Sequence, residues 1–314
     1  MTAAATRTQE AFAAAHTVTG CANVGTVVGS RSTRSGEFLC YFLCSVKESS
    51  SSTRGKIMNS FLIGLQFLTR IFVVRQSVWT EQSFGESVKF FPAVGAILGI
   101  ICAAVAGVIN FFELPLFTGA VGFSALIILT GGIHCDGLMD SADGLFSGRE
   151  REKILQIMKD SRAGSFGVVA MILVAALEIS TLAELARLST EFLVAAIFSA
   201  PIIARLMMVV TIGAFPYARP EGMGKAFAKF TTRRTIFFAA GETLLLLLPL
   251  SLAGGKFLIC AATASCAALI VTWKFASFAT EKIGGVTGDI YGAVTTLSEM
   301  FALITFLLAA VILS

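Results

Sequence analysis

The sequence predicts an all-α, polytopic integral membrane protein, a helical bundle of about seven transmembrane helices with a short additional helix at the N-terminal side. Three observations favour this class. Only 14% of the 314 residues are charged, against about 25% in soluble domains. The mean hydropathy is +0.82. Apolar segments of about 20 residues, the length that crosses a bilayer as a helix, recur along the chain. These segments lack the alternation of polar and apolar residues that is typical of membrane β-barrels.

The N-terminal part differs in composition from the rest of the chain. Residues 1–56 are rich in Ala, Ser, Thr and Gly, and their one apolar run, 38–46, is too short to span a bilayer. We expect this segment to be disordered or to be an extension that the functional product lacks, and residues 57–314 to form one membrane-embedded domain. Residues 59–74 are apolar but short, which favours a helix that lies in the membrane interface or packs on the bundle.

Basic residues in the loops predict the orientation of the bundle. The expected spans are 90–112, 114–133, 165–186, 191–214, 235–253, 257–278 and 292–313. The loops on one side carry fourteen Lys and Arg residues, whereas the loops on the other side carry only Arg187 and Lys256. Because loops rich in Lys and Arg remain in the cytoplasm, we expect the basic side to be cytoplasmic.

Composition also limits the chemistry. None of the seven Cys residues forms a CxxC pair, and most lie in apolar runs, so we interpret them as buried apolar side chains. The chain has only two His, so a bound metal ion is expected to have oxygen ligands, which indicates Mg²⁺, Mn²⁺ or Ca²⁺. A formal net charge of +4 over the whole chain produces only a weak electrostatic field, which argues against a nucleic-acid partner.

Three carboxylates after the second expected span form the main candidate site. Asp136, Asp140 and Asp143 have the spacing i, i+4, i+7, so on a helix they fall within a sector of about 60°. Like charges on one stripe beside a membrane are costly, and a divalent cation that bridges them removes this cost. We predict that all three are catalytic residues and bind Mg²⁺. The alternative is that these residues form a solvated helix start whose negative charges interact favourably with the helix dipole. That alternative explains one Asp well but three Asp residues on one stripe poorly.

Charged residues elsewhere give further candidates. Asp160 is a candidate metal ligand or base. Arg162 is a candidate phosphate ligand, because a guanidinium group donates two parallel hydrogen bonds. The alternative is that this segment only caps the following helix and carries positive charge on the cytoplasmic side of the membrane. Arg205 lies inside an expected span, where a charge indicates function, and we predict that it binds substrate. Its alternative is an ion pair within the bundle, with Glu178 or Glu242 as partner.

Two glycine-rich loops complete the candidate site. Their predicted substrate-binding residues are Arg219, Gly222, Gly224, Gly285, Gly288 and Asp289. Glycines let the backbone approach a ligand closely, and backbone amides before a helix favour anions. A plain basic loop and a Gly-rich turn with a helix cap are the respective alternatives.

These loop candidates all fall on the expected cytoplasmic side. A Mg²⁺ cluster, cations and glycine-rich loops at one membrane face indicate phosphoryl-group transfer on a bulky or lipid-embedded substrate, in which the protein supplies positioning and charge neutralisation. The sequence has no GxxxxGK[ST] motif, so it is not a P-loop ATPase.

Several stretches resemble the cobalamin synthase family, the adenosylcobinamide-GDP ribazoletransferases. They are LQFLTR (65–70), FFPAVGAILG (90–99), GGIHCDGLMDSADGLFSGREREKILQIMKDSRAGSFG (131–167), YARPEGMG (217–224) and GGVTGDIYGAVTTLSEM (284–300). The resemblance covers about residues 57–314. It implies that the adenosylcobinamide-phosphate group passes from adenosylcobinamide-GDP to α-ribazole or its 5′-phosphate, with GMP released. It also implies Mg²⁺ as cofactor and a multi-pass location in the bacterial inner membrane, with the active site facing the cytoplasm.

Two other functions remain as alternatives at this point. One is a CDP-alcohol phosphotransferase of phospholipid synthesis, although the full DGxxAR…GxxxDxxxD arrangement is not present in order. The other is a cation-coupled transporter that uses intramembrane charges, among them Glu178, Arg205, Glu242 and Glu299. Transporter sites lie near the membrane midplane, whereas the Asp stripe is at a loop–helix junction. The sequence leaves open whether the protein acts as a homo-oligomer.

Overall fold

The computed structural model describes residues 53–73 and 80–314, and every regular element within them is a helix. The prediction of an all-α protein is therefore confirmed. Residues 1–52, which hold most of the predicted N-terminal extension, lie outside the described residues. The first described helix, α3, runs from Thr53 to Leu68, so residues 53–56 are helical although the sequence assigned them to that extension.

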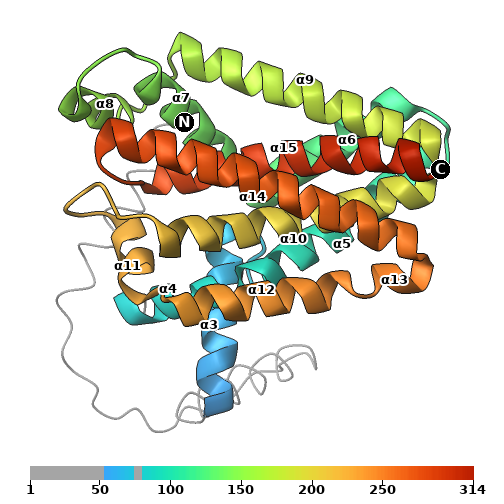
Figure 1. Cartoon of the computed structure of the whole chain (residues 1–314), viewed down its shortest axis with the longest axis horizontal. Helices are drawn as coiled ribbons and strands as arrows, with labels where there is room; N and C mark the ends of the chain where they lie inside the picture. Colours follow the sequence, from blue (N-terminus) through green and yellow to red (C-terminus); the bar gives the residue numbers. More distant parts are fainter. Residues whose placement is uncertain (1–52, 74–79) are drawn as a thin grey trace, which may run out of the picture. The chain divides into compact units, whose positions relative to one another are not determined.

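Within the described residues, six helical segments are long and apolar enough to cross a membrane. They are α5 (Phe91–Asn110), which continues directly from α4 (Glu81–Ser87) and η3 (Val88–Phe90), α9 (Ser165–Leu188), α10 (Thr190–Ala214), α12 (Arg233–Leu247) with α13 (Leu250–Ala253), α14 (Gly255–Ile283) and α15 (Gly288–Leu313). These helices lie roughly parallel to one another in Figure 1. They confirm six of the expected spans.

The seventh expected span, 114–133, corresponds to one half of a bent pair of helices. α6 (Pro115–Thr130) covers the expected range and is long enough to cross a membrane only together with α7 (Ile133–Leu145), from which it is bent by 92°. Gly131 and Gly132 form the break and have φ angles of 65° and 73°, a left-handed conformation that glycine adopts without a steric penalty. The helix that carries the Asp stripe therefore turns sharply away from the axis of α6.

The short helix α3 runs across the direction of the bundle helices in Figure 1. It packs on α4, η3 and α5, and its buried residues include Leu62, Ile63, Leu65 and Leu68. Ile57 and Met58 at its start are exposed. This arrangement agrees with the expectation of a short helix that lies in the interface or packs on the bundle.

The centre of the bundle is α10, which contacts α5, α9, α12, α14 and α15. Two glycines of α5 let it approach α10 closely. A Cβ atom on Gly95 would lie 2.5 Å from the carbonyl oxygen of Pro201, and one on Gly99 would lie 2.4 Å from that of Phe198. Small residues four apart commonly mediate such close packing of membrane helices.

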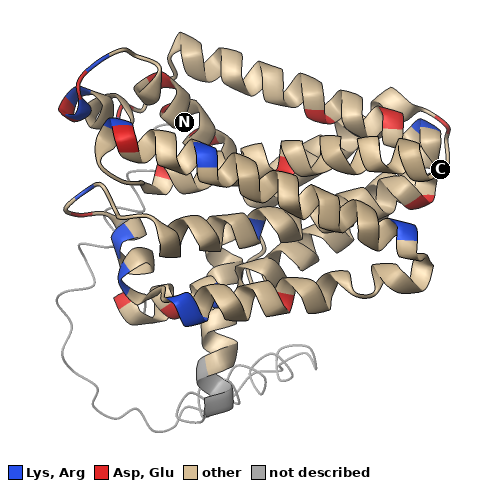
Figure 2. Cartoon of the chain, viewed as in Figure 1, with Lys and Arg blue, Asp and Glu red and all other residues tan. Residues whose placement is uncertain are grey.

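The two ends of the bundle differ in what they carry. α7, α8 (Arg151–Ile157), α11 (Met223–Phe230) and the start of α15 lie at one end, and the C-terminus lies at the other (Figure 1). Lys and Arg gather mainly at the first end, and few charges lie between the two ends (Figure 2). The candidate loops predicted from the sequence therefore share one end of the bundle.

Candidate active site

The Asp-bearing helix α7 is held against the start of α15 by a contact between two glycines. A Cβ atom on Gly137 would lie 2.7 Å from the carbonyl oxygen of Asp289, and one on Gly292 would lie 3.2 Å from the Cα atom of Gly137. Any larger residue would push the helices apart. This contact brings Asp136 and Asp140 of α7 to the same place as Asp289 at the start of α15.

A cavity of about 180 Å³ opens where these elements meet. Four of the predicted site residues line it: Asp136, Gly224, Gly288 and Asp289. Residues from α3, α10 and α11 complete the wall, and they are mainly apolar. Segments that are far apart in the sequence thus form one site at the end of the bundle, as the sequence predicted for the loops.

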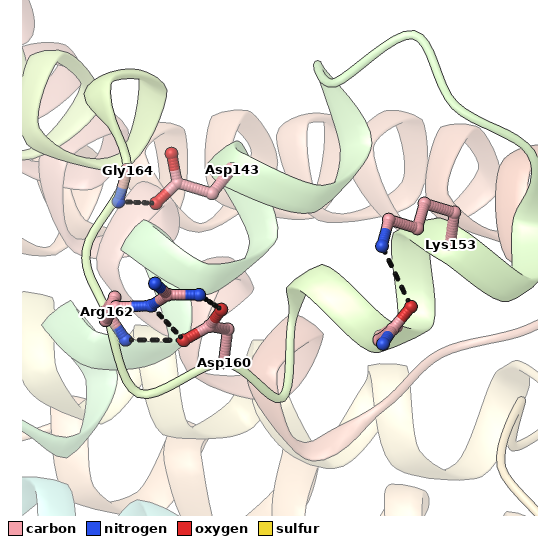
Figure 3. A network of polar contacts seen from close by, with 6 residues as sticks. Asp143, Lys153, Asp160, Arg162 and Gly164 are labelled. Atoms are coloured by element: carbon pink, nitrogen blue, oxygen red, sulfur yellow. Dashed lines mark hydrogen bonds and ion pairs between the residues drawn. The ribbon is translucent and has the colours of Figure 1, made fainter.

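Asp143, in contrast, is engaged with the protein backbone. Its Oδ2 atom accepts a hydrogen bond from the Gly164 N–H at 2.7 Å (Figure 3). Its Oδ1 atom accepts one from the Gly167 N–H at 2.9 Å. These N–H groups belong to the start of α9, where helix amides have no partner within the helix and favour a negative charge. Asp143 therefore fixes α7 to α9, and its predicted role as metal ligand stays a prediction.

The carboxylates fit a magnesium site that the substrate completes. Asp140 lies within electrostatic range of Asp136, Asp289 and Asp143, so the region is rich in carboxylate oxygen. Among the described residues, however, no three His, Cys, Asp or Glu side chains are grouped closely enough to hold a metal ion by themselves. Mg²⁺ commonly takes one or two carboxylates together with phosphate oxygens and water, and Asp136 and Asp140 are the pair that would hold it.

Asp160 and Arg162 pair with each other on the loop before α9. The Asp160 carboxylate accepts hydrogen bonds from Arg162 Nε at 3.0 Å and Nη2 at 2.7 Å (Figure 3). These hydrogen bonds lower the pKa of Asp160 to about 2. Its predicted role as metal ligand or base stays a prediction. The Arg162 side chain is 86% exposed. On the preceding helix α8, Lys153 donates a hydrogen bond to Gln156 at 3.0 Å.

Arg219 occupies a more enclosed position than Arg162. Its side chain is 13% exposed, and its Nη2 atom donates to Asp289 Oδ2 at 2.9 Å. Asp289 lines the cavity, so Arg219 contacts the cavity wall through this carboxylate, although it is not itself part of the wall. The Nε atom of Arg219 has no hydrogen-bond partner among the described residues, which leaves a guanidinium donor for a ligand. This geometry suits the predicted substrate-binding role.

Three glycines of the two loops accommodate neighbouring protein groups. A Cβ atom on Gly222 or Gly224 would lie 2.8 Å or 2.7 Å from the Tyr217 side chain, and one on Gly285 would lie 2.3 Å from the Pro216 carbonyl oxygen. Main-chain hydrogen bonds from Val286 to Pro216 and from Ala218 to Val286, both 2.8 Å long, join the loops. These contacts explain why the loops need glycine at these positions, and a close backbone approach to substrate stays a prediction.

Arg205 also requires a correction. Its side chain is fully buried within α10, it is not part of the cavity wall, and it forms an ion pair with Glu299 of α15. The structure thus gives the alternative reading, an ion pair inside the bundle, although the partner is neither Glu178 nor Glu242. Desolvated charges require such pairing, so Arg205 and Glu299 do not need a transported ion to explain them.

Sequence reasoning missed three residues at this end of the bundle. His134 and Tyr291 line the cavity, although neither is among the candidates that the sequence provides. Arg151 is one of the fourteen Lys and Arg residues in the basic loops. Its Nε atom donates to the carbonyl oxygen of Ile283 at 2.8 Å, and its Nη2 atom donates to that of Ala218 at 3.2 Å. Arg151 therefore joins α8 to both glycine-rich loops, a role that spacing in the sequence does not reveal.

Replacing Arg151 by Lys is expected to loosen these loops, because a lysine ammonium cannot bond both carbonyl groups with the same planar geometry. We expect kcat/KM to fall about three- to tenfold, the scale of one or two lost hydrogen bonds. Backbone hydrogen exchange at Ala218 and Val286 should become faster. Arg149→Lys, an exposed neighbour, is the control and should leave both measurements unchanged. Unchanged exchange in Arg151→Lys would contradict the role of Arg151.

Comparison with known proteins identifies the family. The chain matches the family model described as cobalamin-5-phosphate synthase over residues 60–307. It is 38% identical to the adenosylcobinamide-GDP ribazoletransferase of Desulfitobacterium hafniense, with 79% of this chain and 96% of the relative covered. The enzyme of the same name from Acetivibrio thermocellus is 37% identical, with coverage of 81% and 99%, and that from Pseudomonas aeruginosa is 34% identical, with coverage of 80% and 98%. No solved structure matches the chain. The chain therefore belongs to the cobalamin-5-phosphate synthase family of transferases, as its motifs indicated.

Proposed function

We propose that this protein transfers the adenosylcobinamide-phosphate group from adenosylcobinamide-GDP to α-ribazole or its 5′-phosphate, with release of GMP and with Mg²⁺ as cofactor. The observation that carries the proposal is that Asp136 and Asp289 line one cavity and that Arg219 is paired with Asp289. In this reaction the acceptor oxygen forms a new bond to phosphorus while the bond from phosphorus to the GMP oxygen breaks. The relatives from Desulfitobacterium hafniense and Acetivibrio thermocellus are named adenosylcobinamide-GDP ribazoletransferases, which supports the same substrates.

The residues of the site have separate tasks in this proposal. Asp136 and Asp140 would hold Mg²⁺, which supplies neutralisation of phosphate charge when bound. Arg219, which is held next to the Asp289 carboxylate, donates hydrogen bonds to the pyrophosphate of the donor. The Gly137–Gly292 contact and the Asp143 cap hold α7, α9 and α15 together, so that the charged groups keep their positions as charge develops on the leaving GMP.

Purified full-length protein provides the test. In detergent or lipid nanodiscs with Mg²⁺, it should convert adenosylcobinamide-GDP and α-ribazole into GMP and a cobalamin product, and both products can be quantified chromatographically. Chelation of divalent cations should stop the reaction, and added Mg²⁺ should restore it. GMP release without the cobalamin product would indicate hydrolysis and contradict the proposed transfer. Full activity after chelation would contradict the cofactor.

We further propose that the protein lies in the bacterial inner membrane with this site facing the cytoplasm. The basic loops that support this orientation share the end of the bundle that carries the cavity. In a variant without native cysteines, we expect Arg149→Cys to react with a membrane-impermeant maleimide only after the inner membrane is permeabilised. Glu113→Cys, in the loop between α5 and α6, should react in intact cells. The reverse labelling pattern would overturn the orientation.

A further inference from the structure

Two buried polar side chains in the cavity wall have no protein partner. His134 of α7 is 4% exposed and Tyr291 of α15 is 1% exposed, and both line the cavity. Among the described residues, neither ring nitrogen of His134 nor the Tyr291 hydroxyl has a hydrogen-bond partner. Buried polar groups are nearly always hydrogen-bonded, because unpaired ones lose the bonds they would make to water. These unpaired atoms therefore indicate a bound ligand that forms hydrogen bonds with them.

The rest of this wall is apolar and partly aromatic. Phe67, Leu68, Met208 and Phe227 line the cavity beside the two polar side chains, and the rings of Phe67 and Phe227 pack with their centroids 5.1 Å apart. An apolar wall with a few fixed polar groups is typical of a small-molecule site. The exposed part of the cavity is different, since it carries the Asp136 and Asp289 carboxylates. The cavity thus has an acidic mouth and a buried aromatic wall.

We propose, building on the proposed transfer reaction, that this buried wall is the binding site for the acceptor nucleoside. The aromatic and aliphatic side chains contact the flat benzimidazole base, and His134 and Tyr291 form hydrogen bonds with the polar atoms of the nucleoside. The ribose then lies toward the acidic mouth, where its hydroxyl group reaches the phosphorus of the donor.

The other parts of the substrates fit this wall less well. A cavity of about 180 Å³ is far too small for the corrin ring of the donor. Guanine carries several donors and acceptors along its edges, and two polar side chains cannot satisfy them all. A benzimidazole base has a single free ring nitrogen and an otherwise apolar surface. Size and polarity therefore both favour the acceptor.

Equilibrium binding of labelled α-ribazole to the full-length protein, without donor and without Mg²⁺, tests the inference directly. Tyr291→Phe removes one oxygen atom and should weaken binding about three- to tenfold, the scale of one neutral hydrogen bond. His134→Leu should weaken binding at least as much, and His134→Gln should restore part of it. Tyr217→Phe is the matched control: its ring lies 6.5 Å from that of Tyr291 but is not part of the wall.

Steady-state kinetics give a second readout. In Tyr291→Phe, KM for α-ribazole should rise by the same factor as its dissociation constant, while kcat and KM for the donor remain unchanged. Unchanged α-ribazole binding in both Tyr291→Phe and His134→Leu would overturn the inference, even if the wild-type protein is fully active. A rise in KM for the donor alone would also overturn it. Failure of the wild-type protein to form product would instead contradict the proposed function.

Discussion

Replacing Asp136 or Asp140 by Asn is expected to lower kcat by about 100-fold or more, which corresponds to about 2.7 kcal/mol of transition-state stabilisation. Asn keeps the size of the side chain but removes the negative charge that a Mg²⁺ site requires. Stability should not decrease, because Asp140 lies in the repulsive field of Asp136, Asp289 and Asp143. Turnover at increasing Mg²⁺ and thermal unfolding in detergent measure the two effects. Normal turnover with a normal Mg²⁺ requirement in Asp140→Asn would contradict the proposed site.

Asp143→Asn separates the metal ligands from the residue that fixes α7 to α9. Asp143 accepts two backbone hydrogen bonds, from Gly164 and Gly167. Asn offers only one acceptor oxygen and turns its NH₂ group toward an N–H donor. We expect a loss of about 1–2 kcal/mol of stability, seen as a lower unfolding temperature than in Asp136→Asn. An unchanged unfolding temperature together with a strongly raised Mg²⁺ requirement would show instead that Asp143 is mainly a ligand.

Most of the fold could be predicted from the sequence because the bilayer imposes strong constraints. Span length and apolarity follow from the thickness of the hydrocarbon core, and six expected spans agree with the structure. The bent pair could not be predicted in the same way. Gly131 and Gly132 permit a left-handed turn, but glycines are also tolerated within membrane helices. The turn brings α7 against α15, through Gly137 and Gly292, and against α9, and these contacts between distant segments are not visible in the sequence.

The candidate site was predicted less completely, because side-chain partners depend on the tertiary structure. Helical spacing placed the three Asp residues on one stripe, but it could not show that Asp143 accepts its hydrogen bonds from α9. Charge alone made Arg205 a candidate, whereas the structure pairs it with Glu299. His134 gave no periodic or charge signal that marked it for binding. Its buried, unpaired nitrogens become visible only when α7 and α15 are placed together.

Arg219→Lys is expected to lower kcat/KM about tenfold or more, whereas Arg162→Lys should change it less than about twofold. A loss of about 1.5–3 kcal/mol is usual for a hydrogen bond to a charged group. Lys keeps the positive charge but lacks the planar pair of donors that matches a phosphate. The sequence predicted the same phosphate-binding role for both arginines. The structure distinguishes them, because Arg219 is 13% exposed beside the cavity and Arg162 is 86% exposed on a loop.

The contrast between the two arginines also tests what Asp289 does. Arg219 donates to Asp289 Oδ2, and its Nε atom has no partner within residues 53–73 and 80–314, so an entering pyrophosphate competes with Asp289 for a guanidinium that is already oriented. Asp289→Asn removes the charge that holds Arg219 in place, and we expect it to raise KM for the donor while leaving KM for the acceptor unchanged. Steady-state kinetics with each substrate varied in turn measure both values.

Equal, small effects of Arg219→Lys and Arg162→Lys would mean that neither guanidinium contacts the pyrophosphate. Both would then act only as positive charges on the cytoplasmic side, and the phosphate donors would have to come from other groups at the mouth of the cavity.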